Sequence, residues 1–596
     1  MAITHYQMAS FQSSFHFCML RKTLRQKSSL HFAKRCEATN KIFQTHGSVA
    51  IYQKTLWTHD LIDGLETDFL INRKEKVNEL EVNVARMFMD YENGDISNLE
   101  LLELIDNIER LGLGHRFQTN MKRVLDKIAT VNENSLGLKE EEEEEEEEED
   151  NLHALSLKFR ILRQSGYRVS QDFQRKFKES RGGLTGGLKE LLSIYEASYL
   201  SLEGEPDLHE AKLFATEKLL KLTGHENEAM KDHVNHALDI PLYRRMLRLE
   251  ARWYIDAYGK RKDANKQLLE LAILDFNIVQ SAHKRDLQEV SKWWEKTGLV
   301  RKLDFIRDRL MECFFWSVGM VFEPQYYTCR VELTKIATLI TTIDDIYDVY
   351  GSLNELKVFT HAVKRWDINA VENMPEYLQL GFLALYNTIN EMGYETLSAQ
   401  GINIIPNLAR VWGELLEAFL VEAEWTHNNY MPTFKDYLDN AWRSVSGMVL
   451  LTHGYFLMNQ DVKDDAIESL ENFHDLFKWS SMLFRLYNDL AALADEIDKD
   501  KSPNAISCYM YEHSVSEEVA REHVKTLIDK AWMKMIEARI ACSEHMTDPL
   551  IDMAINLARV SSCMYQYGDG IKDPEARTKD RVMSIIIKPF DTSEIP

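Results

Sequence analysis

A long apolar segment that ends in a group of aspartates is the most informative pattern in the chain. From Val331 onwards apolar residues recur every three or four positions, which predicts an α-helix with a buried face. The segment ends in Asp344, Asp345 and Asp348, and residues four apart lie on the same face of a helix. Carboxylates at the end of a buried helix need a positive partner, and Mg²⁺ prefers a few carboxylates together with phosphate oxygens. Two interpretations are open here, a metal site and a solvated acidic helix end.

Helical patterning begins near Trp57 and continues to the C-terminus. Only 25 Gly and 11 Pro occur in 596 residues, so we expect an all-α protein. The run Ser97-Asn98-Leu99-Glu100 predicts a helix start with a capping box, and Gly112 predicts its stop. No repeat of fixed period is present, which argues against a solenoid. Further helices are expected at residues 152–163, 188–202, 241–258 and 268–280, the third beginning with Pro241.

The length of the chain predicts two helical domains rather than one core. Residues 1–46 are basic, rich in Ser and almost free of acids, which is typical of a plastid transit peptide, although a disordered basic tail is the alternative. We expect an N-terminal domain at 47–265, interrupted by an acidic loop at 140–150, and a second domain at 266–596. Residues 261–266 are the expected linker.

Charge and cysteine usage exclude several functions. The chain has 71 basic and 95 acidic residues, a net charge of -24, so we expect no nucleic-acid partner. The seven cysteines are scattered without a CxxC pair, which indicates a reducing compartment and no disulfide or zinc framework. Apolar runs stay shorter than a membrane span, so stable membrane insertion is not expected.

Three further features accompany the aspartates. Arg307-Asp308-Arg309 precedes them, and guanidinium groups suit bidentate capture of phosphate, although such a run is more often a surface ion-pair cluster. Asn488 and Glu496 are two helical turns apart, which predicts a second set of oxygen ligands on one helix face. Aromatic rings could stabilise a carbocation, although each is singly more often a core residue; the candidates are Trp316, Phe484, Tyr487, Tyr565 and Tyr567.

Together these features resemble the class I plant terpene synthases over nearly the whole chain after its first 50 residues. The matching stretches are RDRLMECFFWSVGMVFEPQ, IDDIYDVYGSLNEL, AVKRWD, VEAEW and FRLYNDL. The resemblance implies an N-terminal α-helical barrel domain without catalytic residues and a C-terminal class I terpenoid synthase α-bundle. It also implies a lyase that binds a prenyl diphosphate with three Mg²⁺ ions, for which Mn²⁺ can substitute.

The resemblance also assigns roles to individual residues. It makes Asp344, Asp345 and Asp348 the first group of metal ligands, and Asn488 and Glu496 the second. Substrate binding falls to Arg307 and Arg485, together with the ligands Asp344, Asp348 and Asn488. The catalytic residues it implies are Arg307, Trp316 as a cavity wall, and Tyr565 and Asp569 in the loop MYQYGDG that closes over the substrate.

Six positions depart from the family pattern or distinguish its members. Ala492 replaces a Ser or Thr ligand, and Asn504 replaces a lysine. Gly47-Ser48 stand where monoterpene synthases carry two arginines ahead of Trp57, which favours acyclic products. Asn504 and Phe484 are shared with isoprene synthases, but Ala337 stands where those enzymes narrow their pocket with Phe, so a ten-carbon chain has room.

We therefore expect a monoterpene synthase of the plastid stroma, monomeric or homodimeric, that converts geranyl diphosphate to ocimene, myrcene or linalool. The alternatives are an isoprene synthase acting on dimethylallyl diphosphate, a sesquiterpene synthase acting on farnesyl diphosphate, and a catalytically impaired helical homologue. A chain-elongating prenyltransferase would need a second DDxxD, and a class II cyclase would need DxDD; neither motif is present.

Overall fold

The computed structural model describes most of the chain after residue 51. The described residues are 52–67, 69, 73–134, 151–169, 172–180, 187–222, 228–458, 470, 474–492, 502–542, 548–571, 574 and 576–592. The expected transit peptide, Gly47-Ser48, the acidic loop at 140–150 and Glu496 lie outside them. Within the described ranges all regular structure is helical, which confirms the all-α prediction.

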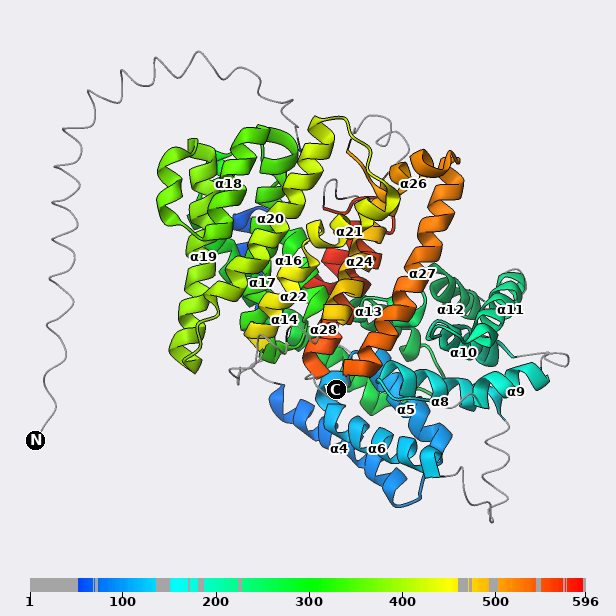
Figure 1. The fold of residues 1–596 in the computed structure, drawn as a ribbon. Coiled ribbons are helices and arrows are strands. Elements are labelled where there is room, and N and C mark those ends of the chain that lie inside the picture. The colour runs from blue at the N-terminus through cyan, green and yellow to red at the C-terminus, as the bar shows by residue number, and fades with distance from the viewer. Residues whose placement is uncertain are drawn as a thin grey trace, which may run out of the picture.

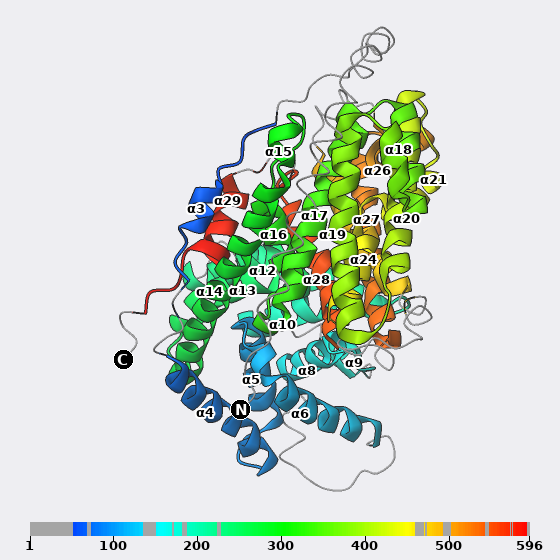
Figure 2. The same cartoon turned by 90° about the vertical axis from the view of Figure 1, so that its left-hand side faces the viewer.

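The N-terminal half comprises residues 52–259; its helices α4, α5, α6, α8 and α9 form the lower part of the molecule in Figure 1, whereas α3 lies beside α14 of the C-terminal half in Figure 2. The helices of the N-terminal half run in short antiparallel steps: α10 packs on both α8 and α11, and α5 packs on α8. The elements are α3 (His59–Asp63), α4 (Lys74–Glu92), α5 (Asn98–Arg110), α6 (Gly114–Asn134), α8 (Leu152–Gln164), α9 (Asp172–Ser180), α10 (Leu188–Ser198), α11 (Pro206–Leu222), α12 (Glu228–Asp239), η1 (Leu242–Arg244) and α13 (Leu247–Gly259).

The C-terminal half is a bundle of longer helices that stand side by side in Figure 2. At its centre α24 packs against α22, α27 and α28, while α18 packs on α20 at one side. The elements are α14 (Lys266–Thr297), α15 (Leu299–Lys302), α16 (Leu310–Met320), η2 (Pro324–Tyr326), α17 (Tyr327–Asp345), η3 (Ile346–Tyr350), α18 (Leu353–Arg365), η4 (Ile368–Asn373), α19 (Glu376–Gln400), α20 (Ile405–His427), α21 (Phe434–Ser444), α22 (Gly447–Met458), α24 (His474–Ala491), α26 (Ala505–His513), α27 (Glu517–Cys542), α28 (Asp548–Met564), α29 (Ala576–Val582) and η5 (Met583–Ile587).

Helix α5 follows the sequence pattern closely. Ser97 and Glu100 form the expected capping box, each satisfying a backbone N–H that the helix start leaves without a partner. The helix ends at Arg110, and Gly112 adopts a left-handed φ of 78°. A Cβ at Gly112 would lie 2.8 Å from the Ala251 side chain, so glycine is required here for packing as well as for conformation.

The predicted helix at 241–258 is wrong in its first part. Pro241 is followed by the single 3₁₀ turn η1, Arg245 is extended with ψ of 147°, and α13 begins only at Leu247. The break lets the buried Arg245 side chain reach carboxylates on two other helices. Of the other predictions, α8 matches residues 152–163 within one residue, α10 ends four residues earlier than expected, and α14 continues to Thr297. A helix-free connection at 260–265 lies where the linker is expected.

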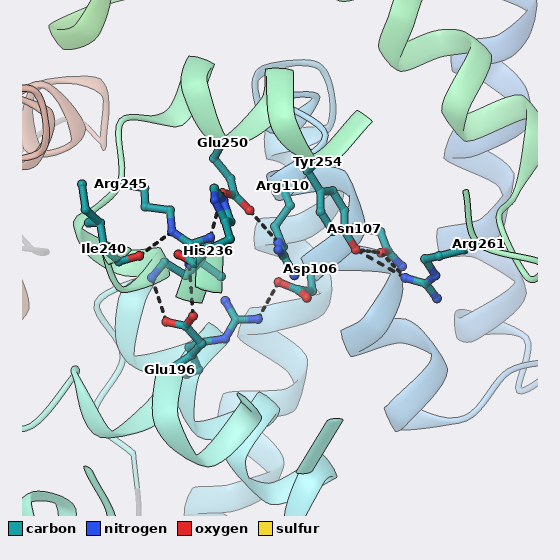
Figure 3. A network of polar contacts seen from close by, with 12 residues as sticks. Asp106, Asn107, Arg110, Glu196, His236, Ile240, Arg245, Glu250, Tyr254 and Arg261 are labelled. Carbon is teal, nitrogen blue, oxygen red and sulfur yellow. Dashed lines mark hydrogen bonds and ion pairs between the residues drawn. The ribbon is translucent and has the colours of Figure 1, made fainter. Parts of the chain in front are cut away.

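Arg245 belongs to a buried ionic network at the centre of the N-terminal half, shown in Figure 3. Its centre is Glu250, which is 3% exposed and accepts hydrogen bonds from Arg110 (2.9 Å) and Arg245 (2.8 Å) and lies 2.7 Å from the His236 ring. Burial alone would raise the pKa of Glu250, but the two guanidinium groups outweigh burial and hold the pKa well below its usual range. The carboxylate is therefore ionised and binds three helices together.

We expect Glu250→Gln to destabilise the protein by about 3–5 kcal/mol, because it leaves Arg110 buried without its ion-pair partner and Arg245 with only the longer contact to Glu196 (3.5 Å). Thermal unfolding followed by circular dichroism measures the change, and Glu217→Gln, an exposed position, should leave the midpoint unchanged. Since the pKa of Glu250 is lowered in the folded state, its stabilising effect is complete above the pKa of an unfolded Glu, about 4.3. The difference between variant and wild type should shrink as the pH falls below that value, and a constant difference would contradict this assignment.

Candidate active site

The residues expected to carry chemistry surround a cavity of about 140 Å³ in the C-terminal half. Helices α16, α17, α20 and α24 and the loop after α28 supply its walls. The lining includes Arg307, Cys313, Trp316, Ala337, Ile340, Thr341, Asp344, Phe419, Phe484, Arg485, Asn488, Tyr565, Asp569 and Ile571. The structure thus brings together residues that lie more than 260 positions apart, from Arg307 to Asp569.

The three aspartates occupy different environments. Asp344 is in the last turn of α17, its side chain is 33% exposed, and it faces the cavity. Asp345 is fully buried and accepts hydrogen bonds from the backbone N–H of Arg307 (2.7 Å) and from the hydroxyl of Tyr52 (3.0 Å). Burial raises the pKa of Asp345 to about 6, although Arg307 opposes the shift. In this conformation Asp345 supports the cavity wall rather than lining it.

The spacing predicts that Asp348 continues the α-helix of Asp344, but the structure shows that it does not. Helix α17 ends at Asp345, and residues Ile346–Tyr350 form a π-helical turn closed by the Gly351 N–H on the Ile346 carbonyl (2.8 Å). The turn is anchored by Tyr347, which is buried and hydrogen-bonded to Thr360 (2.6 Å), while Asp348 is exposed to solvent. π-turns of this kind are frequent at functional sites.

Arg307 neutralises the first acidic group. Its guanidinium group is 9% exposed, with Nη2 2.5 Å from Asp344 Oδ2 and Nε 2.8 Å from Asp345 Oδ1. Burial would lower the pKa of Arg307, but the two carboxylates outweigh it and raise the pKa. The run 307–309 is therefore part of the site and not a surface cluster.

The segment that precedes α3 crosses this side of the site. In addition to the contact of Tyr52 with Asp345, the Gln53 carbonyl accepts a hydrogen bond from Arg309 (3.0 Å). Trp57 donates to Glu312 on α16, whose pKa burial raises to about 7. Sequence reasoning did not identify Tyr52, because an isolated tyrosine in a segment without periodicity carries no local signal.

Arg485 on α24 is the matching cation of the opposite wall. It is held by Glu422 (3.1 Å) and Ser444 (2.5 Å), and it lies 3.7 Å from Asp489. Asp489 is buried and accepts hydrogen bonds from the Tyr437 hydroxyl and from the backbone at the start of α26. Glu422 and Ser444 were also missed; the stretch VEAEW contains Glu422, but only the fold shows that it faces Arg485.

The second ligand set is only partly described. Asn488 lines the cavity from α24, which ends at Ala491, and Glu496 lies outside the described residues, so a common helix face for Asn488 and Glu496 stays a prediction. At the C-terminal end of α24 the Arg521 guanidinium group donates to the carbonyls of Leu490 (2.8 Å) and Ala492. Ala492 itself lines a groove between the two halves and not the catalytic cavity.

Asn504, the second departure from the family pattern, caps helix α26. Its side chain accepts a hydrogen bond from the Ser507 N–H (2.8 Å), and the Ser507 hydroxyl accepts from the Asn504 N–H (3.0 Å). Asparagine is among the best N-cap residues and lysine is not. The exchange therefore supports the helix that contacts Asp489.

Three of the five candidate aromatic residues line the cavity. The rings of Trp316, Phe484 and Tyr565 lie with centroids 4.8–6.1 Å apart. The expectation is wrong for the other two. Tyr487 accepts a hydrogen bond from Trp532 and faces the groove between the halves, and Tyr567 is 38% exposed beneath Arg577.

The donor set at the cavity mouth fits a hard divalent cation. Asp344 and Asn488 line the cavity from opposite walls and could supply a carboxylate and an amide oxygen, and Asp348, outside the cavity lining, lies near enough to Asp344 for their charges to interact. Among the described residues no group of three or more His, Cys, Asp or Glu is arranged as a complete metal site. Mg²⁺ commonly takes part of its coordination from substrate phosphates and water.

Comparisons with known proteins identify the class that this fold and site define. Residues 56–238 match the family model for the terpene synthase N-terminal domain, and residues 295–534 match the terpene synthase metal binding domain. The chain belongs to the terpene synthase family and is a lyase of that family. No helix in the described part of the chain is both long and apolar enough to cross a membrane.

Individual relatives are similar over almost their whole length. Tricyclene synthase TPS4, chloroplastic, of Medicago truncatula is 45% identical over 93% of this chain and 94% of its own. Isoprene synthase, chloroplastic, of Populus tremuloides is 46% identical over 91% of this chain and 90% of its own. The crystal structure of grey poplar isoprene synthase with three Mg²⁺ ions and dimethylallyl-S-thiolodiphosphate is 44% identical, with a TM-score of 0.79 over 90% of this chain and 99% of that chain.

We expect Asn504→Lys to destabilise α26 by about 1 kcal/mol, although it restores the residue common in the family, because the cap is lost. Asn504→Asp keeps a capping oxygen and should be close to wild type. Thermal unfolding of the three proteins tests this, and equal melting temperatures for the lysine variant and the wild type would contradict a capping role.

Proposed function

We propose that this terpene synthase ionises geranyl diphosphate in a Mg²⁺-dependent reaction and forms an acyclic monoterpene such as ocimene, myrcene or linalool. The observation that carries the proposal is the position of Ala337. Its methyl side chain lines the cavity on α17, seven residues before Asp344, so the apolar space continues away from the metal site. A bulky side chain at this position would close that space.

Two kinds of residue would bind the diphosphate, arginines directly and metal ligands through Mg²⁺. Arg307 and Arg485 stay charged at neutral pH and approach the cavity from opposite walls, which suits bidentate binding of phosphate oxygens. Asp344, Asp348 and Asn488 would hold Mg²⁺, with Glu496 as a further ligand, and Mn²⁺ accepts the same oxygen donors. When bound, the metal neutralises the developing charge on the leaving diphosphate.

The apolar walls control what happens after ionisation. Trp316, Phe484 and Tyr565 present aromatic rings to the cavity, and ring faces attract a carbocation more strongly where water is excluded. Asp569 and Tyr565 come from one loop at the mouth, which we propose closes the site over the substrate. The product leaves after proton loss or after capture of one water molecule.

Isoprene formation from dimethylallyl diphosphate is the second candidate. The cavity of about 140 Å³ is smaller than the roughly 300–1,000 Å³ of common small-molecule sites, and Phe484 fills one wall against Trp316. A small cavity favours a five-carbon or ten-carbon substrate over farnesyl diphosphate, which makes a sesquiterpene product the weakest alternative.

A plastid location accompanies this proposal. The basic, Ser-rich residues 1–46 and the chloroplastic relatives both support import into the plastid, and we propose the stroma as the compartment.

With Mg²⁺, we expect wild-type protein to release diphosphate from geranyl diphosphate faster than from the dimethylallyl or farnesyl substrate. Gas chromatography of the volatile products identifies the product class. Asp344→Ala should abolish turnover while the circular dichroism spectrum stays unchanged, and Asp304→Ala, an exposed neighbour, should retain activity. No diphosphate release from any of the three substrates would refute the proposed enzyme activity.

We expect Ala337→Phe to lower kcat/KM for geranyl diphosphate at least about ten-fold, because the ring occupies the space of the second isoprene unit. Activity with dimethylallyl diphosphate should fall less or rise. Ala337→Ser, which adds little volume, is the control. An equal loss with both substrates would indicate that Ala337 does not determine chain length.

A further inference from the structure

The loop at residues 564–571 joins α28 to the C-terminal segment and carries three cavity-lining residues, Tyr565, Asp569 and Ile571. Its backbone is folded tightly on itself. Gly568 has a φ of 124°, and a Cβ at Gly570 would lie 2.6 Å from the Met564 carbonyl, so neither position accepts another residue without strain. The placement of these side chains therefore depends on what holds this loop.

The two ends of the loop are held within the C-terminal half. Arg581 donates to the Cys563 carbonyl and to the side-chain oxygen of Gln566, both at 2.5 Å. At the other end Arg309 donates to the Ile571 carbonyl (2.8 Å). Arg577 also lies over the Tyr567 ring (3.9 Å), so the C-terminal half holds both ends of the loop and contacts its centre.

The centre of the loop is held from the N-terminal half as well. Gln566 Nε2 and the Tyr567 hydroxyl both donate to Asp239 Oδ1, at 2.8 and 3.2 Å. Asp239 is the last residue of α12, 327 positions before Gln566. Tyr565, whose ring lines the cavity, immediately precedes the two residues that make this contact.

Asp239 is held in turn by the buried network of Figure 3. Arg245 donates to the His236 carbonyl (3.0 Å) and to the Ile240 carbonyl (2.6 Å), the residues on either side of the end of α12. Glu250 fixes the Arg245 guanidinium group through an ion pair of 2.8 Å. A buried ionic network therefore determines where the Asp239 carboxylate lies.

We propose that Asp239 is a positioning residue for catalysis: it ties the loop at 564–571 to the N-terminal half and thereby places Tyr565 and Asp569 at the cavity. The inference rests on the proposed function, because it assigns a role in that reaction. It gives the N-terminal half a part in catalysis through one carboxylate, although this half supplies no residue to the catalytic cavity among those described.

If the contact between the loop and Asp239 is lost, we expect the loop to exclude water from the cavity less completely. Loops that close active sites keep water from reactive intermediates, and a loop without its central contact samples more open positions. Both hydrogen bonds to Asp239 lie at the surface, so we expect a moderate effect of about three- to ten-fold on kcat/KM. A looser loop should also raise the proportion of product formed by water capture.

The test compares Asp239→Ala with Asp232→Ala in the full-length protein. Asp232 is an exposed residue seven positions earlier on the same helix, so the control makes the same change of charge. We expect Asp239→Ala alone to increase amide hydrogen exchange in residues 565–571, to lower kcat/KM for geranyl diphosphate, and to raise the ratio of alcohol to hydrocarbon products. Tyr567→Phe, which removes only the donor hydroxyl, should change these quantities in the same direction, and Asp239→Asn should restore part of each.

Hydrogen exchange needs no substrate, so it tests the tie separately from the proposed function. Exchange in 565–571 that is the same in Asp239→Ala and Asp232→Ala would overturn the inference by itself. Increased exchange with unchanged turnover and an unchanged product ratio would overturn the catalytic role. A wild-type protein inactive with all three prenyl diphosphates would refute the proposed function and with it that role, whereas the exchange result would still decide whether the tie exists.

Discussion

The site depends on the mutual neutralisation of buried charge. Arg307 and Arg485 lie on opposite walls of an apolar cavity, and each is buried against carboxylates, Asp344 and Asp345 for the first and Glu422 for the second. An uncompensated charge in such a place costs several kcal/mol, so neither side can be held without the other. Because both signs are already present at the mouth, the diphosphate and cations of the proposed reaction would exchange one set of ion pairs for another.

The N-terminal half uses the same principle for a different purpose. Glu250, Arg110 and Arg245 lie away from the cavity and bind helices to one another. Ion pairs that face a cavity can be replaced by pairs with a ligand, while ion pairs enclosed by packed helices fix the positions of those helices. One protein therefore contains a charge network for chemistry and another for architecture, joined through the end of α12.

The helical class, the capping box at Ser97 and half of the cavity-lining residues could be predicted from the sequence, because helical periodicity and motif spacing are local properties. The break at Arg245 could not, since it depends on Glu196 and Glu250, whose positions only the folded chain defines. The same reason explains why Tyr52 and Glu422 were missed and why Tyr487 was placed in the wrong cavity. The assignment of Asp348 to the α-helix of Asp344 stood on spacing alone and failed where the helix changes its geometry, after Asp345.

The π-turn at Ile346–Tyr350 has a consequence for how the gene can change in length. A π-turn accommodates one residue more than an α-helical turn, so deleting a residue between Asp344 and Gly351 would restore α geometry and rotate all that follows by about 100°. Gly351 is tightly packed, because a Cβ there would lie 2.6 Å from the Leu356 side chain and 2.9 Å from the Ile346 carbonyl. Insertions and deletions should therefore be tolerated less in this turn than individual substitutions. The number of residues in the turn thus helps to determine the direction of the Asp348 side chain.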